Sequence, residues 1–203
     1  MEITSVSFFG CSCGKEGDPH YDGAFAAAEA VAQSGRRVVN GGGPGVMLAA
    51  TMGANEGGGK TTAVYYRPEL AKLAEGPLAA NHADKSFEES NYILRTKKLL
   101  ELGDAYIVFN GGTGTISEFG MAWGLARLYF GHHKPLILYG DFWEHLIKDF
   151  REHMLIRPEE IDVISIVSSP SEVLTALDSY ETVLKKNRHD HKGCTNPECD
   201  LLL

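Results

Sequence analysis

The stretch NGGTGTISEFG follows a run of apolar residues and combines glycines, hydroxyl side chains and one glutamate. Its glycines let the backbone adopt positive φ angles and let a ligand approach without interference from a Cβ atom. Its threonines add hydroxyl groups at the start of a predicted helix, whose free N–H groups and dipole favour an anion. These features are typical of a phosphate-binding turn, called the cradle below. The cradle residues are Gly111, Gly112, Thr113, Gly114 and Thr115.

Glu118 follows the cradle, and its spacing from Thr115 allows two interpretations. In the first, Thr115 and Glu118 form a capping box, in which the glutamate accepts a hydrogen bond from the backbone at the helix start. In the second, Glu118 is a catalytic carboxylate one turn beyond a bound phosphate. The spacing alone leaves both interpretations open.

A second candidate, Arg95, lies on the helix predicted before the cradle. Asn91, Arg95 and Lys98 are four and three residues apart, which places them on one helical face. Because the end of this helix leads into the strand before the cradle, Arg95 can reach the same sheet edge. Its planar fork suits a phosphate or a carboxylate. For Lys98 we expect a solvated helix face instead.

Strand-like and helix-like segments alternate along nearly the whole chain. The predicted strands span residues 3–9, 36–40, 61–66, 105–109, 134–140 and 163–167. The predicted helices span residues 24–35, 46–57, 90–103, 115–130, 141–154 and 170–186. This pattern predicts an α/β, Rossmann-like, doubly wound parallel sheet with helices on both faces. We expect one domain over residues 1–186, a polar loop over 67–87 and a flexible polar tail over 187–203.

Three glycine-rich turns lie at predicted carboxyl ends of strands, at residues 10–14, 41–45 and 111–114. In open parallel sheets, ligands bind outside these ends, where the strand order reverses. The coincidence predicts one site formed by all three turns. The candidate binding residues outside the cradle are Gly10, Gly42, Gly43 and Gly45.

Two familiar nucleotide motifs fail in this chain. Residues 54–61, ANEGGGKT, resemble a phosphate loop, but a helix precedes them and a strand follows, the reverse of the required order. A dinucleotide fold needs GxGxxG after its first strand and an acidic residue ending its second. Here the turn is GCSCGKEG and the second strand ends at Asn40. NAD is therefore not expected, and we predict no cofactor.

The composition limits partners and compartment. A chain of 203 residues with 43% hydrophobic and 23% charged residues is ordinary for a globular protein, and its net charge of -8 argues against nucleic-acid binding. No membrane span or signal peptide is recognisable. Four cysteines are too few for a secreted disulfide framework, so we predict a cytoplasmic protein. Cys11 and Cys13 are expected to line the first glycine turn as small residues, and a redox role for the pair stays open although no other feature of the sequence supports it.

The tail contains four side chains that could bind zinc. Their spacing, H-x-H-x₂-C-x₄-C, is not one of the usual zinc-site patterns. We therefore predict no metal site and keep these residues as weak candidates only. They are His189, His191, Cys194 and Cys199.

Taken together, the glycine motifs resemble those of the LOG family, the cytokinin riboside 5'-monophosphate phosphoribohydrolases often labelled lysine decarboxylase-like. The sequence NGGTGTISE is similar to the family signature PGGxGTxxE, and GGGPGVM and FFGCSCG resemble its other two glycine loops. The resemblance extends over about residues 3–185. It implies a Rossmann-like fold, usually dimeric, that hydrolyses the N-glycosidic bond of a nucleoside 5'-monophosphate such as AMP.

Carried over to this chain, the resemblance gives the site residues their roles. The stretch from Gly112 to Thr115 would hold the 5'-phosphate, Glu118 would act beside the ribose, and Arg95 would orient this acid. Three departures from the family pattern keep a second interpretation open, a non-catalytic protein that binds nucleotides or other phosphorylated ligands. These departures are Thr96, where the family pattern has a lysine, Asn110, where it has a proline, and Met121, where many phosphoribohydrolases have a second acid.

The helix predicted at 115–130 has more large apolar residues than one buried face needs. We therefore predict a homodimer that forms through this helix. The residues behind this prediction are Phe119, Trp123, Leu125, Leu128, Tyr129 and Phe130.

Overall fold

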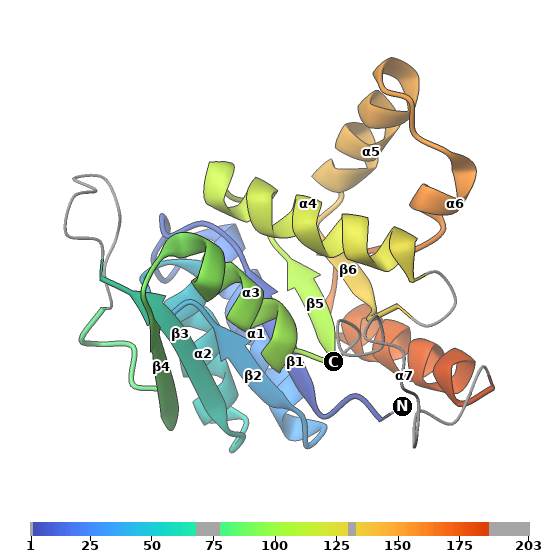
Figure 1. Cartoon of the computed structure of the whole chain (residues 1–203). Coiled ribbons are helices and arrows are strands. Elements are labelled where there is room, and N and C mark those ends of the chain that lie inside the picture. The colour runs from blue at the N-terminus through green and yellow to red at the C-terminus, as the bar shows by residue number, and fades with distance from the viewer. Residues whose placement is uncertain (1, 68–77, 130–132, 187–203) are drawn as a thin grey trace, which may run out of the picture.

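The structure is a computed structural model that describes residues 2–67, 78–129 and 133–186. In these residues a seven-stranded parallel sheet has the order β4-β3-β2-β1-β5-β6-β7 (Figure 1). The strands are β1 (Ser5–Phe9), β2 (Arg37–Asn40), β3 (Thr61–Tyr66), β4 (Lys85–Glu89), β5 (Ala105–Val108), β6 (Leu136–Tyr139) and β7 (Ile164–Val167).

Helices cover both faces of the sheet, which confirms the doubly wound α/β prediction. One face packs against α1, α2 and α7, and the other packs against α3, α4 and α5. The helices are α1 (Pro19–Gln33), α2 (Val46–Glu56), α3 (Tyr92–Leu102), α4 (Thr113–Leu128), α5 (Phe142–His153), α6 (Pro158–Ile161) and α7 (Pro170–Lys186). The helices in the described residues are too short or too polar to cross a bilayer.

Alternate residues of the central strands form the two hydrophobic cores. Phe8 and Ile107 point into the core under α1 and α2, whereas Phe9 and Val108 point into the core under α3 and α4. Successive side chains of a strand face opposite sides of a sheet, so a strand buried on both faces has a continuous apolar sequence. This explains why β1 and β5 could be recognised from FF and AYIV.

The strand order reverses between β1 and β5. The chain adds β2, β3 and β4 on one side of β1 and then crosses to place β5 on its other side. Phe9 of β1 is in register with Val108 of β5, so the turns that follow these strands begin at the same edge. A crevice at this point is the usual ligand site of such sheets.

The predicted loop at 67–87 is partly wrong, because Lys85–Glu89 form the edge strand β4 and pair in parallel with β3. The sequence KSFEE has no apolar alternation, since most of its side chains are exposed at the edge of the sheet. Charged residues are common on edge strands because they discourage pairing with other chains. The short helix α6 and the first turn of α1, which begins at Pro19, were also not predicted.

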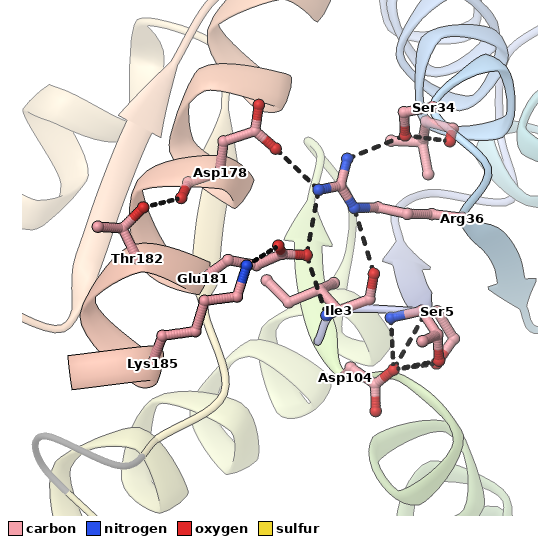
Figure 2. A network of polar contacts seen from close by, with 11 residues as sticks. Ile3, Ser5, Ser34, Arg36, Asp104, Asp178, Glu181, Thr182 and Lys185 are labelled. Atoms are coloured by element: carbon pink, nitrogen blue, oxygen red, sulfur yellow. Dashed lines mark hydrogen bonds and ion pairs between the residues drawn. The ribbon is translucent and has the colours of Figure 1, made fainter. Parts of the chain in front are cut away.

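At the amino ends of the strands, opposite the carboxyl ends where the glycine turns lie, a polar network joins α7 to the residues around β1 (Figure 2). The Arg36 guanidinium donates to Asp178 (2.8 Å) and Glu181 (3.2 Å) of α7 and to the carbonyl oxygen of Ile3 (3.3 Å). Glu181 also accepts from the Ile3 N–H (3.1 Å). The amino ends of the strands are therefore occupied by contacts between elements, so a ligand site is expected at their carboxyl ends.

Helix α3 is fixed at both of its ends. The Asn91 side chain caps its start by accepting from the Leu94 N–H (3.0 Å). At its end, the Lys134 ammonium donates to the carbonyl oxygens of Leu100 (2.8 Å) and Gly103 (2.8 Å). Burial lowers the pKa of Lys134 to about 8, yet the group stays mostly charged at neutral pH and suits the negative end of the helix dipole.

Candidate functional site

A cavity of about 700 Å³ opens at the carboxyl edge of the sheet, beside the strand-order reversal. Residues 8–13 of β1 and its following turn form one wall, and residues 112–115, 117 and 118 of α4 and its approach form another. Gly41 after β2, Met47 of α2, Tyr66 of β3, and Tyr92 and Arg95 of α3 complete the lining. All three predicted glycine turns therefore contribute to or adjoin one cavity.

The cradle forms the beginning of α4. The Ile116 N–H donates to the Gly112 carbonyl oxygen (3.0 Å), which is a regular helical bond. The N–H groups at the first positions of a helix, here Thr113, Gly114 and Thr115, have no acceptor within the helix. Together with the positive end of the helix dipole, they can bind an anion in the cavity.

The capping-box interpretation of Glu118 is wrong. Helix α4 begins at Thr113 with Gly112 as its N-cap, so Thr115 lies inside the first turn rather than at the cap position. Glu118 is 6% exposed and its Oε1 lies 3.3 Å from Nη1 of Arg95. The glutamate is therefore available to the cavity and does not serve the helix start.

Burial changes the acidity of Glu118. Desolvation raises its pKa to about 7, although the charge and hydrogen bond of Arg95 act in the opposite direction. A carboxyl group with a pKa near neutrality can both donate and accept a proton under ordinary conditions. Perturbed acids in clefts are candidates for functional groups.

Arg95 joins three elements around the cavity. Its Nε donates to the Val64 carbonyl oxygen of β3 (3.0 Å), and its Nη2 donates to the Gly41 carbonyl oxygen after β2 (3.2 Å). With the ion pair to Glu118, these bonds hold the guanidinium in one orientation. Arg95 thus positions Glu118 and the second glycine turn, and much of its hydrogen-bonding capacity is used by the protein itself.

The predicted glycines divide into two groups. Gly10, Gly112 and Gly114 line the cavity together with Thr113 and Thr115. Four other candidates are not among the lining residues that the structure describes, and they shape the turns behind it. They are Gly42, Gly43, Gly45 and Gly111.

Gly45 shows what this second group does. Its φ is +63°, and a Cβ atom at this position would collide with the carbonyl oxygens of Cys11 and Cys13. The second glycine turn therefore packs directly on the first. Only glycine combines this backbone conformation with such a close approach.

Cys11 and Cys13 line the first turn, as expected, but they are also joined as a disulfide. Cys11 is 8% exposed, whereas Cys13 is exposed. The bond closes a small ring around Ser12 at the wall of the cavity. Spacing alone did not indicate this pairing, because the conformation of the turn decides whether the two sulfur atoms meet.

Several residues of the cavity were missed in the sequence, and Tyr66, Tyr92 and Ser117 are among them. The Tyr92 hydroxyl lies within hydrogen-bonding distance of the Ser117 hydroxyl (2.5 Å) and donates to the Gly114 carbonyl oxygen (3.1 Å). Its ring meets that of Tyr66 edge to face, with centroids 6.1 Å apart. The position of Tyr66 at the end of a strand was an available signal. Tyr92 and Ser117 had none, because they meet only through folding.

One departure from the family pattern removes a cationic group from α3. Thr96 occupies the position expected of a lysine, and it is buried within α3. Lys97 and Lys98 do not replace that lysine, because both form ion pairs with Glu101 on the outer part of α3 (3.1 and 3.5 Å). Lys98 is half-buried, with its ammonium 5.3 Å from the centre of the Phe87 ring, so it is less solvated than expected.

The weak metal candidates of the tail, His189, His191, Cys194 and Cys199, lie outside the described residues. Within the described part of the chain, one group of side chains is close enough together to ligate an ion, and its three members are exposed on α5. It does not adjoin the cavity lining. The group consists of Asp149, Glu152 and His153.

Comparison with known proteins gives one relative by sequence and several by fold. An uncharacterized protein of Archaeoglobus fulgidus is 27% identical over 140 residues, 69% of this chain and 87% of that protein. The molybdenum cofactor binding protein of Rippkaea orientalis has 21% identity and a TM-score of 0.65, over 89% of this chain and 99% of that chain. The molybdenum cofactor carrier protein of Chlamydomonas reinhardtii has 18% identity and a TM-score of 0.60, over 91% and 99%.

A family model gives the assignment. The model described as "Possible lysine decarboxylase" matches residues 47–177, a segment that contains Arg95, the cradle and Glu118 and begins just after the second glycine turn. This segment is more than half of the chain. The protein therefore belongs to the LOG-like family described as possible lysine decarboxylases.

Proposed function

We propose that the protein hydrolyses the N-glycosidic bond of a nucleoside 5'-monophosphate, such as AMP, to a free base and ribose 5-phosphate. The observation that carries this proposal is Glu118, a buried acid whose pKa is about 7, in the same cavity as a helix start suited to phosphate. No cofactor is needed, because water and a positioned acid–base group suffice for this reaction.

The proposed roles follow the geometry of α4. The N–H groups of Thr113, Gly114 and Thr115 bind the phosphate, and Glu118 lies one turn further along the helix beside the ribose. Its carboxylate takes a proton from the water that attacks the anomeric carbon, and the acid so formed returns a proton to the departing base. Such positioned acid–base help is worth about 10²–10⁴ in rate. Arg95 keeps the carboxylate in place.

A second function is favoured by the bonds of Arg95 and by Thr96. With Arg95 bonded to Val64 and Gly41, and a buried threonine where a lysine is expected, the cavity has less positive charge to stabilise a transition state. A non-catalytic binding protein needs no such charge. The molybdenum cofactor, which two structural relatives bind or carry by their names, is one ligand to consider.

One experiment separates the two functions. Purified wild-type and Glu118→Ala proteins are incubated with a panel of nucleoside 5'-monophosphates, and free base and ribose 5-phosphate are quantified by chromatography. Glu101→Ala, which changes a partly exposed glutamate of α3, is the matched control. We expect base release that is lost in Glu118→Ala alone. Tight calorimetric binding without turnover would support the binding function, and the absence of both would reject nucleotides as ligands.

We also propose a homodimer, but through a set of residues that shares only Leu128 with the set first expected, and Phe130 of that first set lies outside the described residues. Phe119 is buried in the core, and Trp123 and Leu125 pack partly buried against it, so they are not free for a partner. Apolar side chains exposed on α3 and α4 are better candidates. They are Ile93, Leu94, Ile116, Met121 and Leu128. Light scattering of wild-type and Ile116→Asp proteins at micromolar concentration tests this proposal, since a monomeric wild type rejects it.

We further propose that residues 1–186 are the functional unit and that the protein acts in the cytoplasm. The site and its supporting contacts are made by residues from Ile3 to Glu181. A chain that ends at Lys186 should therefore keep the base release of the full chain. A large loss of release in the shortened protein would show that residues 187–203 contribute to the site.

A further inference from the structure

The first glycine turn carries a pair of sulfur atoms that the proposed hydrolysis does not use. Cys11 and Cys13 are joined as a disulfide, and both residues line the cavity. Disulfides in cytosolic proteins are usually transient, and they are catalytic or redox-sensing rather than structural. The question is therefore what this pair could control.

The turn that contains the pair contacts both other glycine turns. The Cys11 N–H donates to the Asn110 carbonyl oxygen at the entrance to the cradle (3.0 Å). The Cys11 carbonyl oxygen accepts from the N–H of Val46, the first residue of α2 (2.9 Å). Gly45 packs against the carbonyl oxygens of Cys11 and Cys13. A change in the conformation of residues 11–13 therefore reaches both neighbouring turns directly.

We propose that Cys11 and Cys13 form a reversible redox modification site whose state controls the anion cradle. The oxidised pair holds the three turns in the arrangement described above. When the pair is reduced, the two sulfur atoms must separate to a non-bonded distance, and the turn gains conformational freedom. The cradle must then be ordered by the ligand on binding, which weakens affinity. The coupling of the turns does not depend on the identity of the ligand.

The oxidant of this site is a low-molecular-weight disulfide, R–S–S–R. The exposed Cys13, as its thiolate, attacks one sulfur of this disulfide, whose S–S bond breaks and releases one RS⁻. The Cys11 thiolate then attacks Cys13 Sγ in the mixed disulfide and releases the second RS⁻. The protein loses two electrons and two protons in total. The small disulfide gains them and becomes two RSH molecules.

The modification is measured on the full-length chain with Cys194→Ser and Cys199→Ser, which leaves Cys11 and Cys13 as its two cysteines. Samples are equilibrated with mixtures of reduced and oxidised glutathione, and free thiols are counted by alkylation and mass spectrometry. We expect two thiols to disappear together as the share of glutathione disulfide increases. A pair that remains reduced, or that stops at one bound glutathione, would overturn the proposed site.

The control of the cradle is measured on the same oxidised and reduced samples. Hydrogen–deuterium exchange of the peptides covering 41–47 and 110–116 should be faster after reduction, a result that needs no ligand. Calorimetry with AMP should show binding weaker by about tenfold in the reduced protein, since an additional segment must be ordered. The variant with Cys11→Ser and Cys13→Ser should behave as the reduced form at every glutathione ratio.

The outcomes separate this proposal from the proposed function. If AMP does not bind in either state but exchange changes with reduction, the redox site stands and the nucleotide proposal fails. If AMP binds equally in both states and exchange is unchanged, the redox control is rejected and the nucleotide proposal is unaffected.

Discussion

The guanidinium of Arg95 and the carboxylate of Glu118 lie 3.3 Å apart inside the protein, although 23 residues separate them in the sequence. Arg95 reaches this place from α3 and Glu118 from α4, so the pair exists only when both helices cover the same face of the sheet. The arginine fixes the acid in position while burial keeps its pKa near neutrality. Both effects give measurable consequences.

Base release should depend on the ionisation of Glu118. If its carboxylate activates water, the rate rises with pH and levels off above the pKa of about 7. Initial rates with AMP measured across this range give the profile. Glu118→Gln should lose both the activity and the titration. A wild-type profile that is flat between about pH 5 and about pH 9 would exclude Glu118 as the base.

Stability should fall as pH rises from about 4.5 to about 7. The pKa of Glu118 is raised in the folded state from its ordinary value of 4.5, so the folded protein binds more protons than the unfolded chain in this window. Urea unfolding at several pH values measures this slope. Glu118→Gln, which cannot titrate, should remove its share of the slope. An identical slope in the variant would contradict the raised pKa.

Removal of Arg95 alone should lower the free energy of unfolding by more than removal of both Arg95 and Glu118. Arg95→Met leaves a buried carboxylate without its partner, which typically costs about 3–5 kcal/mol in free energy of unfolding. It should also raise the pKa of Glu118 further. The double variant Arg95→Met/Glu118→Gln should recover part of this loss, because no charge is then buried. Denaturant unfolding of the three variants tests this, and strictly additive losses would count against the ion pair.

The close packing of the first two glycine turns can be tested with two alanine substitutions. Gly45 and Gly58 both have positive φ angles, +63° and +71°, but an added Cβ meets backbone atoms only at Gly45. Gly58→Ala should cost about 1–2 kcal/mol, the strain of the left-handed backbone alone. Gly45→Ala should cost more and should also weaken AMP binding. Equal losses in unfolding and unchanged binding would show that the turns pack loosely.

The polar network of Arg36 at the amino ends of the strands should affect stability without affecting ligand binding. Arg36→Ala removes bonds to Asp178, Glu181 and Ile3, and we expect a loss of about 1–3 kcal/mol in free energy of unfolding. Lys185→Ala breaks one exposed ion pair with Glu181 and should cost less than about 1 kcal/mol. AMP binding by both variants should equal that of the wild type. Weakened binding in Arg36→Ala would show that the two ends of the strands are coupled.

The sequence predicted the architecture because its signals are local. Apolar runs such as AYIV mark strands buried on both faces, and glycines mark the turns that follow them. Strand β4 was not predicted because KSFEE is an exposed edge strand, and its side chains do not alternate in polarity. The parts of the fold that could be predicted are those that the chain encodes over a few consecutive residues.

The site was less predictable because it depends on where elements begin and meet. The spacing of Thr115 and Glu118 fits a cap or a catalytic group, and the start of α4 at Thr113 excludes the cap. The bond between Cys11 and Cys13 depends on the conformation of one turn, and the contact of Tyr92 with Ser117 depends on the packing of two helices. Such features need three-dimensional coordinates.

The fixation of α3 by Asn91 at its start and by Lys134 at its end has a kinetic consequence. The Arg95 guanidinium is held in place before any ligand arrives, so this part of the site is preorganised. We therefore expect entry of the proposed ligand to require no displacement of the helix, so that the association rate is set by diffusion and orientation. Any slow step in ligand exchange belongs to the turns around the cavity and not to the framework beneath them.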